Sequence, residues 1–218
     1  MSDNTTLIIS GGNLNLTFAN RYLRNHTFTR IISVDNGLSY VQQLGITPDI
    51  IIGDFDTAKK ELVDDYKKKS EISYCQLNPE KDATDTEAAI DLAIQYGSLK
   101  VVILGAMGGR FDHTLGNLQM LYKLKQHNIK GYLLDEQNKI YVITHGIEIH
   151  KEKQSGKYIS LLPFTESVSG LTLIGFKYPL KQYDLCCGTS IGVSNEIIDE
   201  VGKISFDSGV LVVIESND

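Results

Sequence analysis

The chain lacks tryptophan, a long apolar run and a set of cysteines spaced for metal binding. No stretch of its 218 residues approaches the length of a membrane span, and no basic segment and apolar run open the chain as in a secretory signal. Cys75, Cys186 and Cys187 form neither an even disulfide framework nor a zinc-binding pattern. We therefore expect a cytoplasmic protein with reduced thiols and no membrane partner.

The chain also lacks an excess of positive charge. Its formal net charge is −6, whereas general nucleic-acid and anionic-membrane binders need a cationic surface to attract phosphates. Hydrophobic residues make up 42% and charged residues 22%, as in ordinary globular proteins. We expect a globular protein that does not bind nucleic acid, although a locally basic pocket remains compatible with this balance.

Up to about residue 136 the chain alternates short β-rich runs with helical patterns. Leu115, Leu118, Leu121 and Leu124 recur at the spacing of one helix face. Several β-rich runs are continuously apolar, as in parallel strands that are covered on both faces. We predict an α/β fold, with helices on both faces of a mostly parallel sheet, and strands at 7–9, 30–34, 49–52, 72–75, 100–104 and 131–134.

Beyond residue 136 the hydrophobic period changes to two. Ile147 and Ile149 alternate with polar residues, and so do Leu171 and Leu173. A short turn-forming segment, 207–209, separates two β-rich runs and predicts a terminal hairpin. We therefore expect two domains, an α/β domain at 1–136 and an antiparallel β-sandwich or small barrel at 137–218.

Polar and glycine-rich segments follow the predicted strands of the first domain. They are 10–13, 35–37, 53–56 and 105–113. Ligands of open α/β sheets bind beyond the carboxyl ends of the strands. These four segments are therefore the first candidates for a binding site, although the chain has neither a P-loop nor a dinucleotide-binding glycine fingerprint.

Two aspartates, Asp54 and Asp56, come directly after the third predicted strand. If this segment is extended, both carboxylates lie on one side and Phe55 points away. Magnesium favours carboxylates, water and substrate phosphates as ligands, so the pair indicates a magnesium site. The structural alternative is that Asp56 caps a turn or a helix beginning near Ala58.

A second acidic segment contains Asp82 and Asp85. Thr84 and Glu87 fit a capping box, and the helix dipole would stabilise the charge of Asp85 without a metal. Lys81 beside these acids has the charge to neutralise phosphate oxygens. A solvated run of charges is the alternative interpretation.

A glycine-rich segment, 105–113, brings Arg110 to the expected start of a helix. Backbone amides of such a loop can approach an anion closely, and a guanidinium can contact phosphate through two hydrogen bonds. Asp112 would cap the helix or orient Arg110, and a histidine in the position of His113 is more often a helix-start residue than a catalytic base.

Taken in order, these segments resemble the thiamine pyrophosphokinase family. The resemblance spans nearly the whole chain and rests on Asp-Asn-Gly at 35–37, Pro-Asp at 48–49, Gly-Asp-Phe-Asp-Thr at 53–57, Lys-Asp-Ala-Thr-Asp at 81–85, Gly-Gly-Arg-Phe-Asp-His at 108–113, Gly-Phe-Lys-Tyr-Pro-Leu at 175–180 and Gly-Val-Ser-Asn-Glu at 192–196.

The resemblance implies transfer of pyrophosphate from ATP to the hydroxyl of thiamine, giving thiamine diphosphate and AMP. It implies Mg²⁺ on Asp54, Asp56 and Asp85, with Asp82 and Arg110 completing the catalytic set. It further implies a homodimer, with thiamine between the α/β domain of one subunit and the β-domain of the other. The implied thiamine contacts are Tyr178, Ser194 and Asn195, and the implied ATP contacts are Gly11, Asn13, Asp35, Asn36, Gly37, Lys81, Gly109, Arg110, Asp112 and His113.

The chain departs from the usual family pattern at a few positions. Asn36 replaces a commoner glycine, Thr57 replaces a commoner serine, and no tryptophan is present to stack on thiamine, so Tyr178 or another aromatic residue would take that role. The residues alone leave open the general base, a magnesium-dependent kinase or hydrolase with another acceptor, and a noncatalytic sensor of thiamine or nucleotide.

Overall fold

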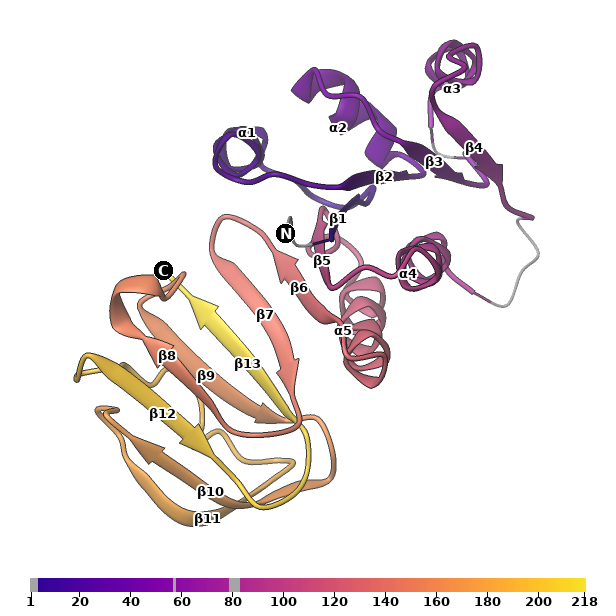
Figure 1. Cartoon of the computed structure of the whole chain (residues 1–218). Helices are drawn as coiled ribbons and strands as arrows, with labels where there is room; N and C mark the ends of the chain where they lie inside the picture. The colour runs from indigo at the N-terminus through magenta and orange to yellow at the C-terminus, as the bar shows by residue number, and fades with distance from the viewer. Residues whose placement is uncertain (1–3, 57, 79–82) are drawn as a thin grey trace. The chain divides into compact units, whose positions relative to one another are not determined.

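The structure is a computed structural model that describes residues 4–56, 58–78 and 83–218 (Figure 1). The chain divides into two compact units, Met1–Glu136 and Gln137–Asp218. Among the helices of the described residues, none combines the length and the apolar character needed to cross a membrane. The cytoplasmic location stays a prediction.

The first unit contains a sheet of six strands in the order β4-β3-β2-β1-β5-β6. All neighbouring pairs in this sheet are parallel, which confirms the predicted α/β class. Each of the six strands predicted from the sequence is present, with ends that differ by up to two residues. The strands are β1 (Thr5–Ile9), β2 (Arg30–Val34), β3 (Ile50–Gly53), β4 (Ser73–Gln76), β5 (Lys100–Leu104) and β6 (Lys130–Leu134).

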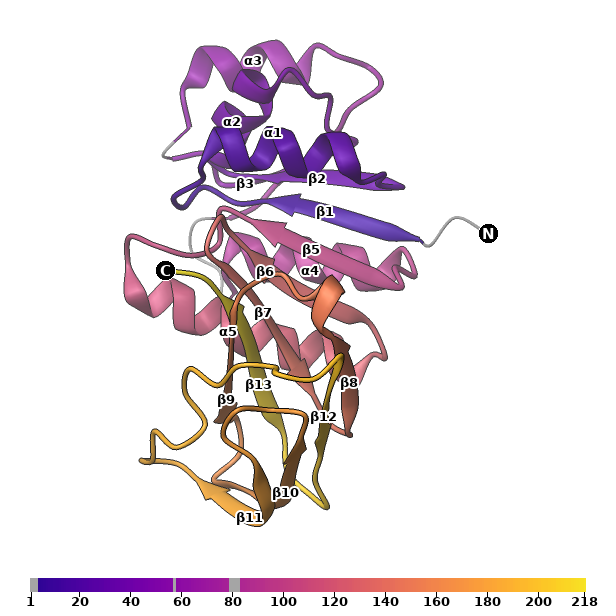
Figure 2. The ribbon, with the colours of Figure 1, turned by 90° about the vertical axis from the view of Figure 1, so that its left-hand side faces the viewer.

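Helices cover both faces of this sheet. Figures 1 and 2 show α1 (Leu16–Asn25), α2 (Gly37–Leu44) and α3 (Lys60–Lys67) on one face. Figure 1 shows α4 (Asp85–Gln95) and α5 (Phe111–Gln126) on the other. Leu7, Ile9 and Ile51 belong to the core beneath the first group. Neighbouring Ile8 and Ile52 are equally buried, so the central strands are covered on both sides, as their continuous apolar runs predict.

The strand order reverses direction between β1 and β5. From β1 the chain proceeds outward through β2, β3 and β4, and it then returns to add β5 and β6 on the other side. At such a topological switch point the loops after the two central strands separate and leave a crevice for a ligand. The backbone nitrogen of Gly12, after β1, donates a 2.8 Å hydrogen bond to the carbonyl of Gly105, after β5. This bond joins the two loops.

The second unit is a β-sandwich of two antiparallel sheets (Figure 2). One sheet has the order β7-β13-β9 and the other β11-β10-β12-β8. Buried residues of both sheets, among them Leu161, Leu171 and Val213, form one core. The strands are β7 (Asn138–Ile143), β8 (Ile147–His150), β9 (Tyr158–Pro163), β10 (Ser167–Ile174), β11 (Leu180–Cys186), β12 (Val201–Ser205) and β13 (Leu211–Ser216), with a short 3-10 helix at Lys151–Lys153.

The predicted terminal hairpin is wrong. The two β-rich runs become β12 and β13, but β12 pairs with β8 and β10 whereas β13 pairs with β7 and β9. The segment between them crosses from one sheet to the other, and Ser208 bridges to Ser169 of β10. Both runs place apolar residues in the shared core. Their alternating pattern therefore fits two strands in facing sheets as well as two paired strands of a hairpin.

Candidate functional site

A cavity of about 480 Å³ lies at the switch point, beyond the carboxyl ends of β1, β2 and β5 and beside the beginnings of α4 and α5. Most residues predicted to bind ATP line it; Gly37 and Asp112 adjoin lining residues in the chain. Lys81 lies outside the described residues. The lining residues are Ser10, Gly11, Gly12, Asn13, Val34, Asp35, Asn36, Thr84, Asp85, Thr86, Gly105, Ala106, Gly108, Gly109, Arg110, His113 and Asn117.

Gly37 has a packing role beneath the cavity. A Cβ atom at this position would lie 2.1 Å from the carbonyl oxygen of Ile9, at the end of β1. The clash would be with backbone, which cannot turn aside as a flexible side chain can. Glycine is therefore required for α2 to begin this close to β1, and the neighbouring Asn36 thereby reaches the cavity wall.

Three carboxylates converge at the ends of β2 and β3. One carboxylate oxygen from each of Asp35, Asp54 and Asp56 lies within 4.8 Å of the other two. Among the described residues, these three form the group of acidic, histidine or cysteine side chains that is close enough to share a metal ion. The predicted metal set of Asp54, Asp56 and Asp85 thus shares two members with the observed group. Asp85 lies on the wall of the cavity, at the first position of α4.

The condition considered for residues 54–56, an extended backbone, is not met in the structure. Phe55 has a φ of 60°, in the left-handed region, and the backbone nitrogen of Asp56 donates a 3.1 Å hydrogen bond to Oδ1 of Asp54. The carboxylates therefore meet across a tight turn rather than along one side of a strand. The Phe55 ring stacks on Tyr74 of β4 with centroids 5.4 Å apart, which anchors the turn to the sheet.

The alternative role for Asp56 as a helix cap does not fit the structure. Helix α3 begins at Lys60 and has Lys59 at its N-cap. Asp35 has a φ of 47°, and Phe55 lies between Asp54 and Asp56, so all three residues of the acidic group have left-handed backbone at or beside them. Such strain is held where surrounding structure enforces it, and it concentrates at functional sites.

The donor set fits a hard divalent cation. Ionised carboxylates offer only oxygen acceptors, and a compact group of them suits Mg²⁺ with water and phosphate as its remaining ligands. Asp35 was predicted to contact ATP rather than metal. Asp35 follows β2, and β2 is the parallel neighbour of β3. Because the carboxyl ends of parallel strands meet at one edge, this position could have predicted that Asp35 lies beside Asp54.

The beginning of α4 carries the predicted cap. The backbone nitrogen of Glu87 donates to Oγ1 of Thr84 at 3.2 Å, which confirms half of the capping box. The Glu87 carboxylate instead accepts a 3.0 Å bond from Lys123 of α5, which also pairs with Asp91. Lys123 therefore links α4 to α5. Asp82, the remaining predicted catalytic acid, lies outside the described residues.

Arg110 and Asp112 form a two-bond ion pair before and within the first turn of α5. Nε donates to Oδ1 at 3.2 Å and Nη2 to Oδ2 at 2.6 Å. Asp112 thus orients Arg110, one of its two predicted roles, and its Oδ1 also accepts from the backbone nitrogen of His113. Arg110 retains further N–H donors for a second anion, and it lies on the cavity wall.

The pair holds its charges over a wide pH range. The hydrogen bonds from Arg110 lower the pKa of the Asp112 carboxyl from 3.8 to about 2 and raise the pKa of Arg110. Since the folded pKa is lowered, the pair's contribution is present above the ordinary pKa of aspartate and is lost as the pH falls through about 2. Both groups are exposed, so the pair serves orientation more than stability.

The predicted thiamine contacts all lie in the second unit, on two loops. Tyr178 is 57% exposed and Ser194 is exposed with a φ of 57°, whereas Asn195 is only 4% exposed. The Asn195 amide bonds to the backbone of Tyr178, which brings the two loops together. Their contact with thiamine stays a prediction.

Comparisons with known proteins find a family match for each of the two units. A model of the thiamin pyrophosphokinase catalytic domain matches residues 20–133, and a model of the thiamin pyrophosphokinase vitamin B1 binding domain matches residues 144–211. Thiamine pyrophosphokinase from Bacillus subtilis is 37% identical over 215 residues, which cover 98% of this chain and 99% of the relative.

Solved structures show the same fold. The crystal structure of the Bacillus subtilis thiamine pyrophosphokinase superposes with a TM-score of 0.87 at 35% identity, covering 98% of this chain and 99% of that chain. The yeast thiamin pyrophosphokinase structure superposes with a TM-score of 0.82, covering 99% and 87% of the two chains; its 17% identity supports the fold alone. The family and fold predicted from the motifs are confirmed, and the chain belongs to the thiamine pyrophosphokinase family.

Proposed function

We propose that the protein transfers the pyrophosphoryl group of ATP to the hydroxyl of thiamine, giving thiamine diphosphate and AMP. Family membership over almost the full chain supports this reaction. The observation that carries the proposal is the place of Asp35, which belongs to the acidic group and also lines the switch-point cavity with Arg110. Asp35 thereby connects the acidic group to the cavity that Arg110 borders.

The acidic group is the proposed site for Mg²⁺. Asp35, Asp54 and Asp56 would hold the ion, with Asp85 available on the cavity wall. Bound Mg²⁺ supplies positive charge that neutralises phosphate oxygens and orients the polyphosphate.

The chain's own groups would position the polyphosphate. Arg110, held by Asp112, presents its remaining donors to phosphate oxygens, and the amides of Gly108 and Gly109 border the same cavity. Phosphoryl-group transfer depends on in-line positioning and on stabilising charge spread over oxygens. The thiamine hydroxyl would attack the β-phosphorus and the bond from that phosphorus to the α,β-bridging oxygen would break, so AMP leaves.

Product analysis tests the reaction directly. Incubation with ATP, Mg²⁺ and thiamine should give AMP and thiamine diphosphate in about equal amounts, because one group passes between them. Without thiamine, AMP formation should fall to background. ADP as the main product would indicate an ordinary kinase, nucleotide cleavage without thiamine a hydrolase, and ligand binding without turnover a sensor.

We further propose a homodimer with each thiamine site between the α/β unit of one subunit and the β-unit of the other. The apolar side chains exposed near the functional residues of both units support it. Phe111, beside Arg110, is 71% exposed, and Tyr178 and Val193 are exposed on the β-unit. A second copy would remove these surfaces from water.

Mixing two inactive variants tests this arrangement. Asp54→Asn damages the α/β half of a site, and Ser194→Trp blocks the β half. If subunits exchange at random, about half of the dimers are mixed and each has one intact site, so the mixture should regain about a quarter of wild-type activity. Activity no higher than the sum of the two variants, after exchange is verified by mass spectrometry, would contradict the shared site.

A further inference from the structure

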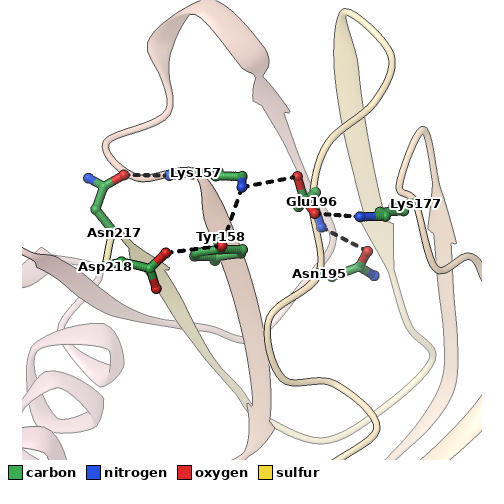
Figure 3. A network of polar contacts seen from close by, with 7 residues as sticks. All are labelled: Lys157, Tyr158, Lys177, Asn195, Glu196, Asn217 and Asp218. Atoms are coloured by element: carbon green, nitrogen blue, oxygen red, sulfur yellow. Dashed lines mark hydrogen bonds and ion pairs between the residues drawn. The ribbon is translucent and has the colours of Figure 1, made fainter.

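Two loops of the second unit are joined by a set of polar contacts (Figure 3). The tyrosine loop, residues 175–179, carries the exposed Tyr178, and the serine loop, residues 192–196, carries the exposed Ser194. They meet at Asn195 and Glu196. Most other members of the network shown in Figure 3 come from the neighbouring strand β9 and the residues after β13.

Asn195 is the central contact between the loops. Its Oδ1 accepts from the backbone nitrogens of Tyr178 at 3.0 Å and Glu196 at 2.9 Å, and its Nδ2 donates to the Tyr178 carbonyl at 2.8 Å. Both acceptor positions and one donor of a nearly buried amide are thus used within the protein. This leaves the amide little capacity to contact a ligand.

An ion pair forms a second link. Nζ of Lys177 donates to Oε1 of Glu196 at 2.7 Å, while the backbone nitrogen of Lys177 donates to the Glu196 carbonyl at 2.8 Å. Lys157 approaches the other carboxylate oxygen at 3.9 Å and donates to the Tyr158 hydroxyl at 3.3 Å. Glu196 therefore lies between two lysines, one from the tyrosine loop and one from the residue before β9 (Figure 3).

The serine loop is also fixed to the free edge of β9. Asn195 and Ile159 exchange two backbone hydrogen bonds, at 2.8 and 3.0 Å, and the Ser194 nitrogen donates to Oγ of Ser160 at 2.9 Å. Gly192 lies so close to β9 that a Cβ atom there would be 2.2 Å from the Leu161 carbonyl oxygen. The loop that carries Ser194 thus has one defined place on the sandwich.

We propose that Asn195 and the Lys177–Glu196 pair are positioning residues that hold Tyr178 and Ser194 in one arrangement before thiamine binds. This inference rests on the proposed function, since it concerns the thiamine half-site of the β-unit. A ligand that meets an ordered surface does not have to order it, so fixed loops raise affinity without touching the ligand. The tethers therefore set thiamine affinity, while ATP binds at the α/β unit.

The test compares thiamine affinity with loop mobility in the full-length protein. Thiamine Kd is measured by calorimetry with Mg²⁺ and a non-hydrolysable ATP analogue, and amide hydrogen exchange is followed at residues 178 and 196. Asn195→Ala should weaken thiamine binding about tenfold or more and speed exchange at both amides, because it removes three hydrogen bonds. Glu196→Gln should weaken binding about two- to fivefold, as expected for a partly exposed ion pair.

Glu200→Gln is the matched control, since it removes one exposed negative charge from the same unit, outside both loops. It should leave both readouts unchanged, and the affinity for the ATP analogue should stay within about twofold in every variant. If Asn195→Ala does not fold, the Lys177–Glu196 ion pair still tests whether the loop contacts set thiamine affinity. The variants are then Lys177→Met, Glu196→Gln and their double variant. The double variant should be no worse than the poorer single one.

An unchanged thiamine Kd in Asn195→Ala, or in both single variants of the ion pair, overturns the inference. Weaker binding without faster amide exchange also overturns it, because Asn195 would then contact thiamine itself. Failure of the proposed function has a different signature: the wild-type protein would form no thiamine diphosphate, although thiamine binding and its dependence on the tethers remain measurable.

Discussion

Replacement of Asp54 by asparagine is expected to lower turnover at least about a hundredfold while the protein stays folded. The amide is similar in size to the carboxylate but removes one negative charge from a group whose oxygens lie within 4.8 Å. Loss of one precisely placed electrostatic contact commonly reduces turnover a hundred- to a thousandfold. Initial rates of thiamine diphosphate formation at saturating ATP, thiamine and Mg²⁺ measure the effect, and circular dichroism checks the fold.

Asp65→Asn provides the matched control for this change. Asp65 is exposed on α3 and pairs with Lys68, so the same substitution alters net charge equally without touching the cavity. It should keep the wild-type rate. Raising Mg²⁺ should partly restore Asp54→Asn if the lost group is a ligand, since a weakened site fills at higher concentration. A wild-type rate in Asp54→Asn would remove Asp54 from the site.

Replacement of Arg110 by methionine should reduce kcat/KM about a hundredfold or more. Methionine keeps much of the side-chain length but removes the donors that the cavity offers to phosphate. Arg110→Lys should lie between the two, because lysine keeps the charge but cannot form the two-bond contact with Asp112. Rates over a range of ATP concentrations separate the effects on KM from those on kcat.

Arg24→Met is a suitable control for the arginine series, since Arg24 is exposed in the last turn of α1 and lies outside the switch-point cavity. Its rate should match the wild type. Equal rates for Arg110→Met and wild type would show that the Arg110–Asp112 pair is a surface ion pair without a part in the reaction.

The α/β half of the fold could be predicted because its central strands, such as β1 and β3, are buried on both faces. The predicted ends of the strands at 100–104 and 30–34 match the observed ones, since short runs rich in β-branched residues are bounded there by polar segments. In the sandwich, period two identifies strands but not their partners. The 207–209 turn joins different sheets, as the separate partners of β12 and β13 show.

The candidate site was predicted in part for a similar reason. The carboxyl ends of parallel strands meet at one edge, so 10–13, 35–37 and 105–113 could be expected around one cavity. The turn at 54–56 could not be foreseen, because a left-handed phenylalanine is uncommon and depends on its contact with Tyr74. Likewise, the sequence does not reveal that the Asn195 amide forms hydrogen bonds within the protein, because its partner is the backbone of Tyr178 on a separate loop.

The Lys123 contacts between α4 and α5 bear on motion during the catalytic cycle. Lys123 of α5 forms ion pairs with Glu87 and Asp91 of α4, so a partly buried set of charges connects the two helices. Asp85 opens one helix and Arg110 precedes the other. A shift of either helix when nucleotide enters or leaves would therefore carry the other with it. Asp85 and Arg110 would then move together, and the distance between them would stay the same from one turnover to the next.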